Sequence, residues 1–119
     1  TTNTSRHRTA GSQLVTARGL EETDVLYQSK LPMEEILRHY DHDYVILEGV
    51  ADCNVPIIIT AHNQEEVQKL FDERAVAVSG VLANTYSKTI LGLPIIHALN
   101  EDEALIDFVE EQALEPKFA

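Results

Sequence analysis

Residues 56–79 read PIIITAHNQEEVQKLFDERAVAVS, with an aliphatic run on each side of a helical pattern. The runs 56–60 and 75–79 are continuous rather than alternating, which is typical of strands buried on both faces. Between them, Asn63 precedes Glu66 by three residues, a spacing that resembles a helix-capping box. An apolar helical stripe follows, made of Val67, Leu70 and Phe71. This order predicts parallel strands joined by a helix.

The same alternation extends toward both ends of the chain. Pro32 precedes apolar residues at helical spacing, namely Met33, Ile36, Leu37 and Tyr40. A last strand is predicted over 94–99, followed by a terminal helix that begins with a cap pattern at Asn100 and Glu103 and ends near Leu114. Weaker patterns predict a strand over 13–17 and an edge strand over 24–27.

We therefore expect an α/β fold with a mostly parallel sheet and helices on both faces. A chain of 119 residues fits one domain over residues 1–119 with a single hydrophobic core. Pro116 cannot continue a helix, so residues 115–119 are expected to form a frayed tail.

Residues 43–49, DYVILEG, carry three consecutive aliphatic side chains and are predicted to form the central strand of the sheet. Glu48 and Gly49 would then lie at its carboxyl end, where open α/β sheets place their ligands. A carboxylate there can hold Mg²⁺, and a glycine lets the backbone approach a γ-phosphate. The alternative interpretation is an ordinary glutamate in a turn.

The composition excludes several classes of partner. Nine basic residues against twenty acidic ones give a net charge of −11, so we expect no nucleic-acid binding and no anionic membrane surface as a partner. The aliphatic runs are far shorter than the roughly 20 residues that cross a bilayer. Cys53 is the only cysteine and no secretory segment is visible, which favours a cytoplasmic setting.

Arg6, His7 and Arg8 form the only basic cluster of the chain and precede a glycine closely. Guanidinium groups suit phosphate or pterin-phosphate oxygens, so the cluster is a candidate anion site. The alternative is a solvated helix face whose arginines pair with local carboxylates.

Other chemistry-bearing residues have ordinary interpretations beside the functional ones. A possible metal site is suggested by His39, Asp41, His42 and Asp43, but an exposed turn explains the same residues. A packed, inert thiol is expected at Cys53 rather than a reactive one. His62 and His97 are interpreted as structural, since no Ser-His-Asp or Cys-His order surrounds them.

Three segments, in this order, resemble the MobB family of GTP-binding accessory proteins for molybdenum cofactor synthesis: residues 4–12, TSRHRTAGS, residues 43–49, DYVILEG, and residues 93–108, LPIIHALNEDEALIDF. Two positions depart from the family pattern, Asn3 where Asp is usual and Val50 where Phe is usual. The phosphate-binding motif Gly-x-x-x-x-Gly-Lys-[Ser/Thr], upstream of the first segment in the family, is absent from the chain.

The resemblance implies a P-loop NTPase-like three-layer sandwich, incomplete at its N-terminus. It implies GTP and Mg²⁺ as ligands of the full protein, with Glu48 as the Mg²⁺ ligand, Gly49 beside the nucleotide, and Arg6, His7 and Arg8 near phosphates. It also implies a homodimer and a molybdopterin guanylyltransferase as partner, with GTP hydrolysis weak at most. Residues 84–88 do not match the Asn-Lys-x-Asp guanine reader of GTPases, because no aspartate follows at the right place.

Two explanations of the absent loop stay open. The chain is either a piece that lacks the first βαβ unit or a naturally shortened homologue, and only the first predicts nucleotide binding by the intact protein. The first rival function is therefore a non-enzymatic interaction module that has lost nucleotide binding. A phosphoacceptor receiver-like domain is a second rival, but the chain has Glu48 rather than an aspartate at the predicted strand end and no early acidic pair.

Overall fold

The computed structural model describes residues 3–86 and 88–113. The chain divides into two compact units, Thr1–Val50 (unit 1) and Ala51–Ala119 (unit 2), and each is described by itself. The expectation of one domain over residues 1–119 stays a prediction. The predicted fraying of residues 115–119 lies outside the described residues.

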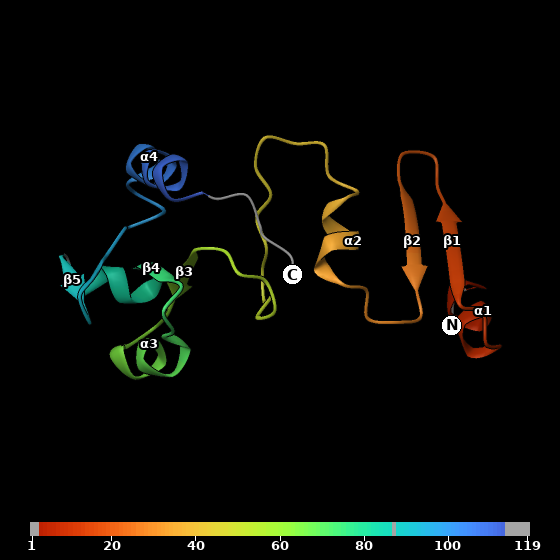
Figure 1. The fold of residues 1–119 in the computed structure, drawn as a ribbon, viewed down its shortest axis with the longest axis horizontal. Helices are drawn as coiled ribbons and strands as arrows, with labels where there is room; N and C mark the ends of the chain where they lie inside the picture. The colour runs from red at the N-terminus through yellow and green to blue at the C-terminus, as the bar shows by residue number, and fades with distance from the viewer. Residues whose placement is uncertain (1–2, 87, 114–119) are drawn as a thin grey trace. The chain divides into compact units, whose positions relative to one another are not determined.

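Unit 1 consists of two short helices and a β-hairpin (Figure 1). Helix α1 spans Asn3–Thr9, strands β1 and β2 span Leu14–Arg18 and Thr23–Tyr27, and helix α2 spans Met33–Leu37. The two strands pair antiparallel, with Leu14 opposite Tyr27. The weak strand patterns over 13–17 and 24–27 are therefore confirmed, as the two arms of one hairpin.

Helix α2 begins directly after Pro32, as the sequence predicts, and buries Met33. Its outer face carries an ion pair between Arg38 Nη2 and Glu34 Oε1 at 2.8 Å. The helix ends at Leu37, three residues before Tyr40, which is 51% exposed. The assignment of Tyr40 to the buried helical face is wrong because the helix does not reach it.

The predicted central strand over residues 43–49 is not formed. Tyr44, Val45 and Ile46 are exposed instead, Ile46 at 91%, and Leu47 is half-buried. A strand needs a neighbour to take up its backbone hydrogen bonds, and no strand of the described residues pairs with this segment. Residues 43–49 therefore have the composition of a buried strand, but no neighbouring strand of the described residues pairs with them.

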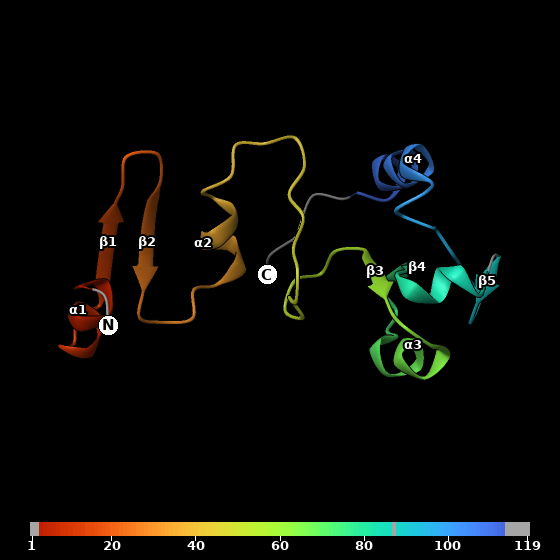
Figure 2. The same cartoon turned by 180° about the vertical axis from the view of Figure 1, so that it is seen from behind.

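Unit 2 is built around a parallel strand pair. Strand β3, Ile57–Thr60, runs into helix α3, Gln64–Leu70, which returns the chain to strand β4, Ala75–Ser79 (Figures 1 and 2). Strand β4 also forms a single parallel bridge, between its Val78 and Ile95, in addition to its pairing with β3. The predicted strands over 56–60 and 75–79 are confirmed, including their parallel direction.

The rest of unit 2 follows β4. A 3₁₀ helix, η1, spans Val81–Asn84, two short antiparallel strands, β5 and β6, span Thr89–Ile90 and Leu93–Pro94, and helix α4 spans Asp102–Gln112. The strand predicted over 94–99 is thus reduced to the short β6 and the bridge at Ile95. Ile96 N continues the pairing by donating to Val78 O at 2.9 Å.

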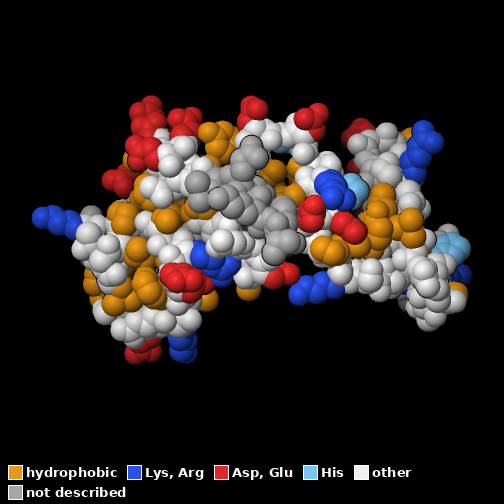
Figure 3. Space-filling model, viewed as in Figure 1, with side chains coloured by type: hydrophobic (Ala, Val, Ile, Leu, Met, Phe, Trp, Pro, Cys, Tyr) orange, Lys and Arg blue, Asp and Glu red, His pale blue; other side chains and the backbone are white. Residues whose placement is uncertain are grey.

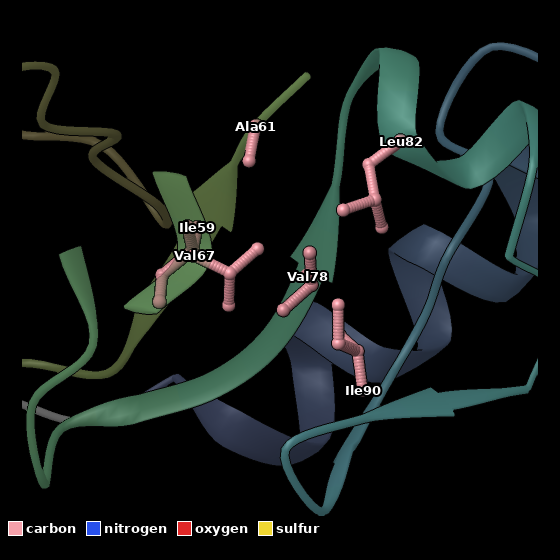
Figure 4. Close-up of a cluster of buried hydrophobic side chains, with 6 residues drawn as sticks. All are labelled: Ile59, Ala61, Val67, Val78, Leu82 and Ile90. Atoms are coloured by element: carbon pink, nitrogen blue, oxygen red, sulfur yellow. The ribbon is translucent and has the colours of Figure 1, made fainter. Parts of the chain in front are cut away.

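One hydrophobic core lies in unit 2 and joins β3, α3, β4 and η1 (Figure 4). Its buried members are Ile59, Ala61, Val67, Val78, Leu82 and Ile90. Val67 is fully buried, whereas Leu70 and Phe71 are 55% and 46% exposed. The stripe predicted for α3 therefore reaches the core through Val67 and not through Leu70 or Phe71, and Phe71 lies beyond the end of the helix.

The N-terminal cap predicted from the sequence is observed at α3 but not at α4. Asn63 caps α3, since its Oδ1 accepts from Glu66 N at 3.0 Å, which confirms half of the predicted capping box. At α4 the predicted cap pattern of Asn100 and Glu103 is wrong: the N-cap is Glu101, without a side-chain cap bond. Asp102 Oδ1 accepts from Glu103 N instead, at 3.0 Å.

The predicted α/β class is confirmed as a mixed α/β fold. The described residues form three two-stranded sheets, of which only β3–β4 is parallel. The sheet is therefore not mostly parallel within the described residues, since the hairpin β1–β2 and the pair β5–β6 are both antiparallel.

Candidate functional site

Glu48 and Gly49 lie in an exposed turn at the end of unit 1. Gly49 has φ +69°, a backbone conformation that side chains rarely adopt, and a Cβ placed on it would meet nothing within 4 Å. Glycine is therefore favoured at position 49 by the positive φ of the backbone, and not by neighbouring atoms that would leave no room for a side chain. The turn leaves the Glu48 carboxylate facing solvent, but it does not place it at the end of a strand.

Arg6, His7 and Arg8 form the last turn of α1 and are exposed. Cations are favourable at a helix carboxyl end, where the peptide dipoles leave partial negative charge. Gly11, with φ +98°, follows and ends the helix turn. In the part of the chain that the structure describes, neither arginine forms an ion pair, and no hydrogen bond joins this cluster to Glu48.

The carboxyl edge of the parallel pair in unit 2 is shaped by Gly80. It has φ +93°, and a Cβ there would lie 2.8 Å from Ala61 N and 2.9 Å from Ala61 O. Ala61 N donates to Ser79 O at 3.1 Å, and Leu82 N donates to Ala61 O at 2.9 Å. The chain leaving β4 therefore crosses directly over the chain leaving β3, which only glycine permits.

His62, the second residue after β3, is fixed by Glu66 of α3. Glu66 Oε2 accepts from His62 N at 2.7 Å and lies 3.2 Å from His62 Nδ1. The hydrogen bond from the His62 backbone N–H, aided by the His62 ring, lowers the pKa of the Glu66 carboxyl. The pair holds the start of α3 against the end of β3.

His97, two residues after the bridge at Ile95, lies at the same edge. Its Nε2 is 2.7 Å from Asn84 Oδ1, a distance at which Nε2–H donates to the amide oxygen. Asn100 Nδ2 is 3.4 Å from the same nitrogen, but it is itself a donor and cannot accept that proton. Glu101 Oε2 accepts from His97 N at 3.0 Å. Both ring and backbone are thus held.

The opposite edge of unit 2 is held by Arg74. Its guanidinium binds both carboxylate oxygens of Asp72, with Nη2 to Oδ2 at 2.7 Å. Nη1 donates to Ala51 O at 3.0 Å and to Cys53 O at 2.7 Å. The Arg74 hydrogen bonds lower the pKa of Asp72. Cys53 is buried in this clamp, as expected for a packed thiol.

A hollow of about 440 Å³ lies between α3 and Tyr86. It is lined by Asn63, Gln64, Glu65, Gln68 and Tyr86. The sequence reasoning missed this site, because Tyr86 reaches α3 only through the crossing at Gly80. His62 and His97 were also interpreted separately, although one follows β3 and the other the parallel bridge at Ile95, and a glutamate four residues further along the chain binds the backbone N–H of each.

Acidic side chains gather over α4 (Figure 3). Five of its eleven residues are Asp or Glu and none is basic, so this surface repels anions. Among the described residues, no group of three or more His, Cys, Asp or Glu side chains is arranged to hold a metal ion. His42 instead makes an edge-to-face ring contact with Tyr40, with centroids 6.1 Å apart.

Within residues 3–86 and 88–113, no helix is both long enough and apolar enough to cross a bilayer. No family model, curated protein or solved structure matches the chain. The arguments for function therefore come from the residues and their geometry, together with the resemblance of the three segments.

Proposed function

We propose that the chain belongs to a MobB-like accessory protein that binds GTP with Mg²⁺ and assists the guanylation of molybdopterin by a partner guanylyltransferase in the cytoplasm. In this proposal Glu48 holds Mg²⁺ beside the nucleotide, Gly49 lies against a phosphate, and Arg6, His7 and Arg8 neutralise phosphate oxygens. The phosphate-binding loop comes from sequence outside this chain.

The turn at Gly49 carries the proposal. An exposed carboxylate directly before a glycine with φ +69° is free to meet a ligand, and no side chain at position 49 blocks the approach of a phosphate to the backbone. The predicted strand before Glu48 does not form, so the support comes from this turn and from the resemblance rather than from a strand-end position.

The finer fold of the proposal is a P-loop-like three-layer sandwich, in which the parallel pair of unit 2 is part of a larger sheet. Strand β3 pairs with β4 on one side, and no strand of the described residues pairs with its other side. A further parallel strand, such as the one that precedes a phosphate-binding loop, can add to this edge. The βαβ connection from β3 through α3 to β4 is of the kind that such sheets contain.

Delivery and positioning, rather than chemistry, are the proposed role. Hydrolysis of GTP needs a base that orients water and a cation that meets the transition-state charge. In the proposal Arg6, His7 and Arg8 serve to bind phosphate, and the chain from Tyr44 to Val50 around Glu48 adds no further base or cation. Any hydrolysis is therefore slow.

The test is Mg²⁺-dependent GTP binding by a protein that includes the residues encoded upstream of Thr1. Substitution Glu48→Gln removes the charge while keeping the size of the side chain, so it should weaken GTP binding at least tenfold and only when Mg²⁺ is present. Glu35→Gln, on the exposed face of α2, is the matched control and should bind as the unchanged protein does. Equal affinity of both variants would remove Glu48 from the site.

The interaction module is the alternative outcome of the same titration. If GTP gives no heat with the complete protein, nucleotide binding has been lost and the fold serves only to dock partners.

A homodimer is part of either version of the proposal. The register of the hairpin puts Leu14, Tyr27 and Val25 on one exposed face, which suits a second copy. A monomer in analytical ultracentrifugation would exclude this pairing.

A further inference from the structure

Unit 2 begins with a short segment, residues 51–55, that belongs to no helix or strand. Of these five residues Cys53 alone is buried, at 4% exposure. The hydrophobic core around Val67 and Val78 does not include Cys53. The segment therefore covers a buried thiol of its own, outside the main core of the unit.

Arg74, the residue before β4, holds this segment. Its Nη1 donates to Ala51 O at 3.0 Å and to Cys53 O at 2.7 Å. Its Nε and Nη2 donate to Asp72 Oδ1 at 3.2 Å and to Asp72 Oδ2 at 2.7 Å. The backbone of Arg74 is fixed as well, since its N donates to Asp72 Oδ1 at 2.7 Å and its O accepts from Ile57 N at 3.0 Å. One guanidinium thus joins the segment to the parallel strand pair.

The contacts of Arg74 differ in kind from those that the segment makes within itself. Val55 N donates to Cys53 O at 3.1 Å, a bond that does not connect the segment to β3 or β4. The bonds from Arg74 reach carbonyls twenty-one and twenty-three positions earlier in the chain and come from a charged donor, which makes them stronger than neutral ones. The Arg74 side chain is 21% exposed, so water competes with them only in part.

We propose that residues 51–55 form a strap that Arg74 holds shut, and that this strap opens by itself while the core of unit 2 stays folded. Opening separates the guanidinium from both carbonyls and brings the Cys53 thiol into contact with solvent. Segments with few buried apolar contacts open at a lower free energy than the core strands and helices that they cover. The closed strap therefore fixes the point at which the chain enters unit 2 and controls access to its buried thiol.

The thiol itself reports the opening. Cys53 is the only cysteine of the chain, so its labelling needs no added residue. The reagent is dithiodipyridine, an uncharged disulfide. The Cys53 thiol loses its proton to solvent, its sulfur attacks the reagent to form a mixed disulfide, and the reagent S–S bond breaks to release thiopyridone, whose absorbance gives the rate. At low reagent concentration the rate follows the population of the open strap.

The dependence of the rate on urea separates the strap from the whole unit. Local opening exposes little surface, so the labelling rate should change only weakly at low urea concentrations, whereas a rate set by global unfolding rises steeply. Ile59→Val, in the core, lowers global stability and should leave the rate without urea unchanged. Circular dichroism measures global unfolding of the same samples.

Variants of the guanidinium test the role of Arg74. Arg74→Gln removes the charge and the fork of donors, so labelling should become at least about tenfold faster. Arg74→Lys keeps the charge, but one ammonium cannot reach the carboxylate and both carbonyls, so its rate should lie in between. Arg38→Gln is the matched control, because it removes an arginine from an exposed ion pair with Glu34 and should leave the rate unchanged.

Faster labelling in Arg74→Gln than in Arg38→Gln, with a weak dependence on urea, supports the strap. Equal rates in these two variants overturn it, and so does labelling of the unchanged protein that rises with urea as steeply as global unfolding does. Should Arg74→Gln fail to fold, the same criteria apply to Arg74→Lys. The experiment needs no nucleotide or Mg²⁺, so its result is independent of the test of Glu48.

Discussion

Units 1 and 2 differ sharply in how they bury their apolar residues. Among the residues that the structure describes, ten buried hydrophobic residues lie in unit 2, whereas unit 1 buries Val15 and Met33 alone. Unit 1 nevertheless has a comparable apolar run, since residues 43–49 were predicted to form the central strand. The difference teaches that an aliphatic run becomes a strand only where a neighbour offers backbone partners, as β4 does for β3.

The largest effect is expected from the centre of unit 2. Leu82 is 1% exposed, and Leu82→Ala would leave a cavity in the core, so it should lower the free energy of unfolding by about 2–5 kcal/mol. Leu20→Ala, in the fully exposed hairpin turn of unit 1, should change it by less than about 0.5 kcal/mol. Urea unfolding followed by circular dichroism measures both. Similar losses for the two variants would mean that the contrast between the units is false.

Two glycines compare the units at the level of the backbone. Gly80→Ala places a Cβ against Ala61 and forces an unfavourable φ, which should cost roughly 2–4 kcal/mol. Gly49→Ala has the same type of backbone but open space around it, so only the conformational cost of about 1–2 kcal/mol applies. The same urea unfolding experiment ranks them. A larger loss at Gly49 would show that its turn is packed.

The cap of α3 is a smaller contribution. Asn63→Ala removes the bond from Asn63 Oδ1 to Glu66 N, and the free energy of unfolding should fall by about 1 kcal/mol. Asn63→Asp keeps an acceptor oxygen and should restore most of the loss. A thermal melt of the three proteins checks the order, and an alanine variant as stable as the unchanged protein would contradict the cap.

The smallest effect concerns acid stability. The Arg74 guanidinium lowers the pKa of Asp72 below its ordinary value of 3.8, so the folded state binds the proton less readily than the unfolded state. The stabilisation is present above pH 3.8 and is lost as the pH falls through the lowered pKa. Asp72→Asn should therefore flatten the fall in stability below that pH. If the free energy of unfolding falls equally with pH in the variant and the unchanged protein, the Asp72–Arg74 pair contributes nothing to acid stability.

Much of unit 2 was predictable from the sequence, because its signals are local or lie between neighbours in the chain. The runs that became β3 and β4 and the cap at Asn63 need only the residues around them. Tyr40 and Ile46 were misassigned for the opposite reason, since their burial depends on where a helix ends and on whether a strand has a partner.

The candidate site was only partly predictable. Glu48 and Gly49 could be named from the sequence, and the turn gives Gly49 a backbone reason that the pattern alone did not contain. The hollow beside Glu65 could not be found in this way. Its walls come from α3 and from Tyr86, which the close crossing of Gly80 over Ala61 brings together.

The free side of β3 also has a consequence for the chain in concentrated solution. Three successive isoleucines along an uncapped strand edge form a template on which another extended polypeptide can grow. There is no proline or charged residue within Ile57–Thr60 to discourage such growth. Precipitation or fibril formation at high concentration is therefore expected to begin at this edge.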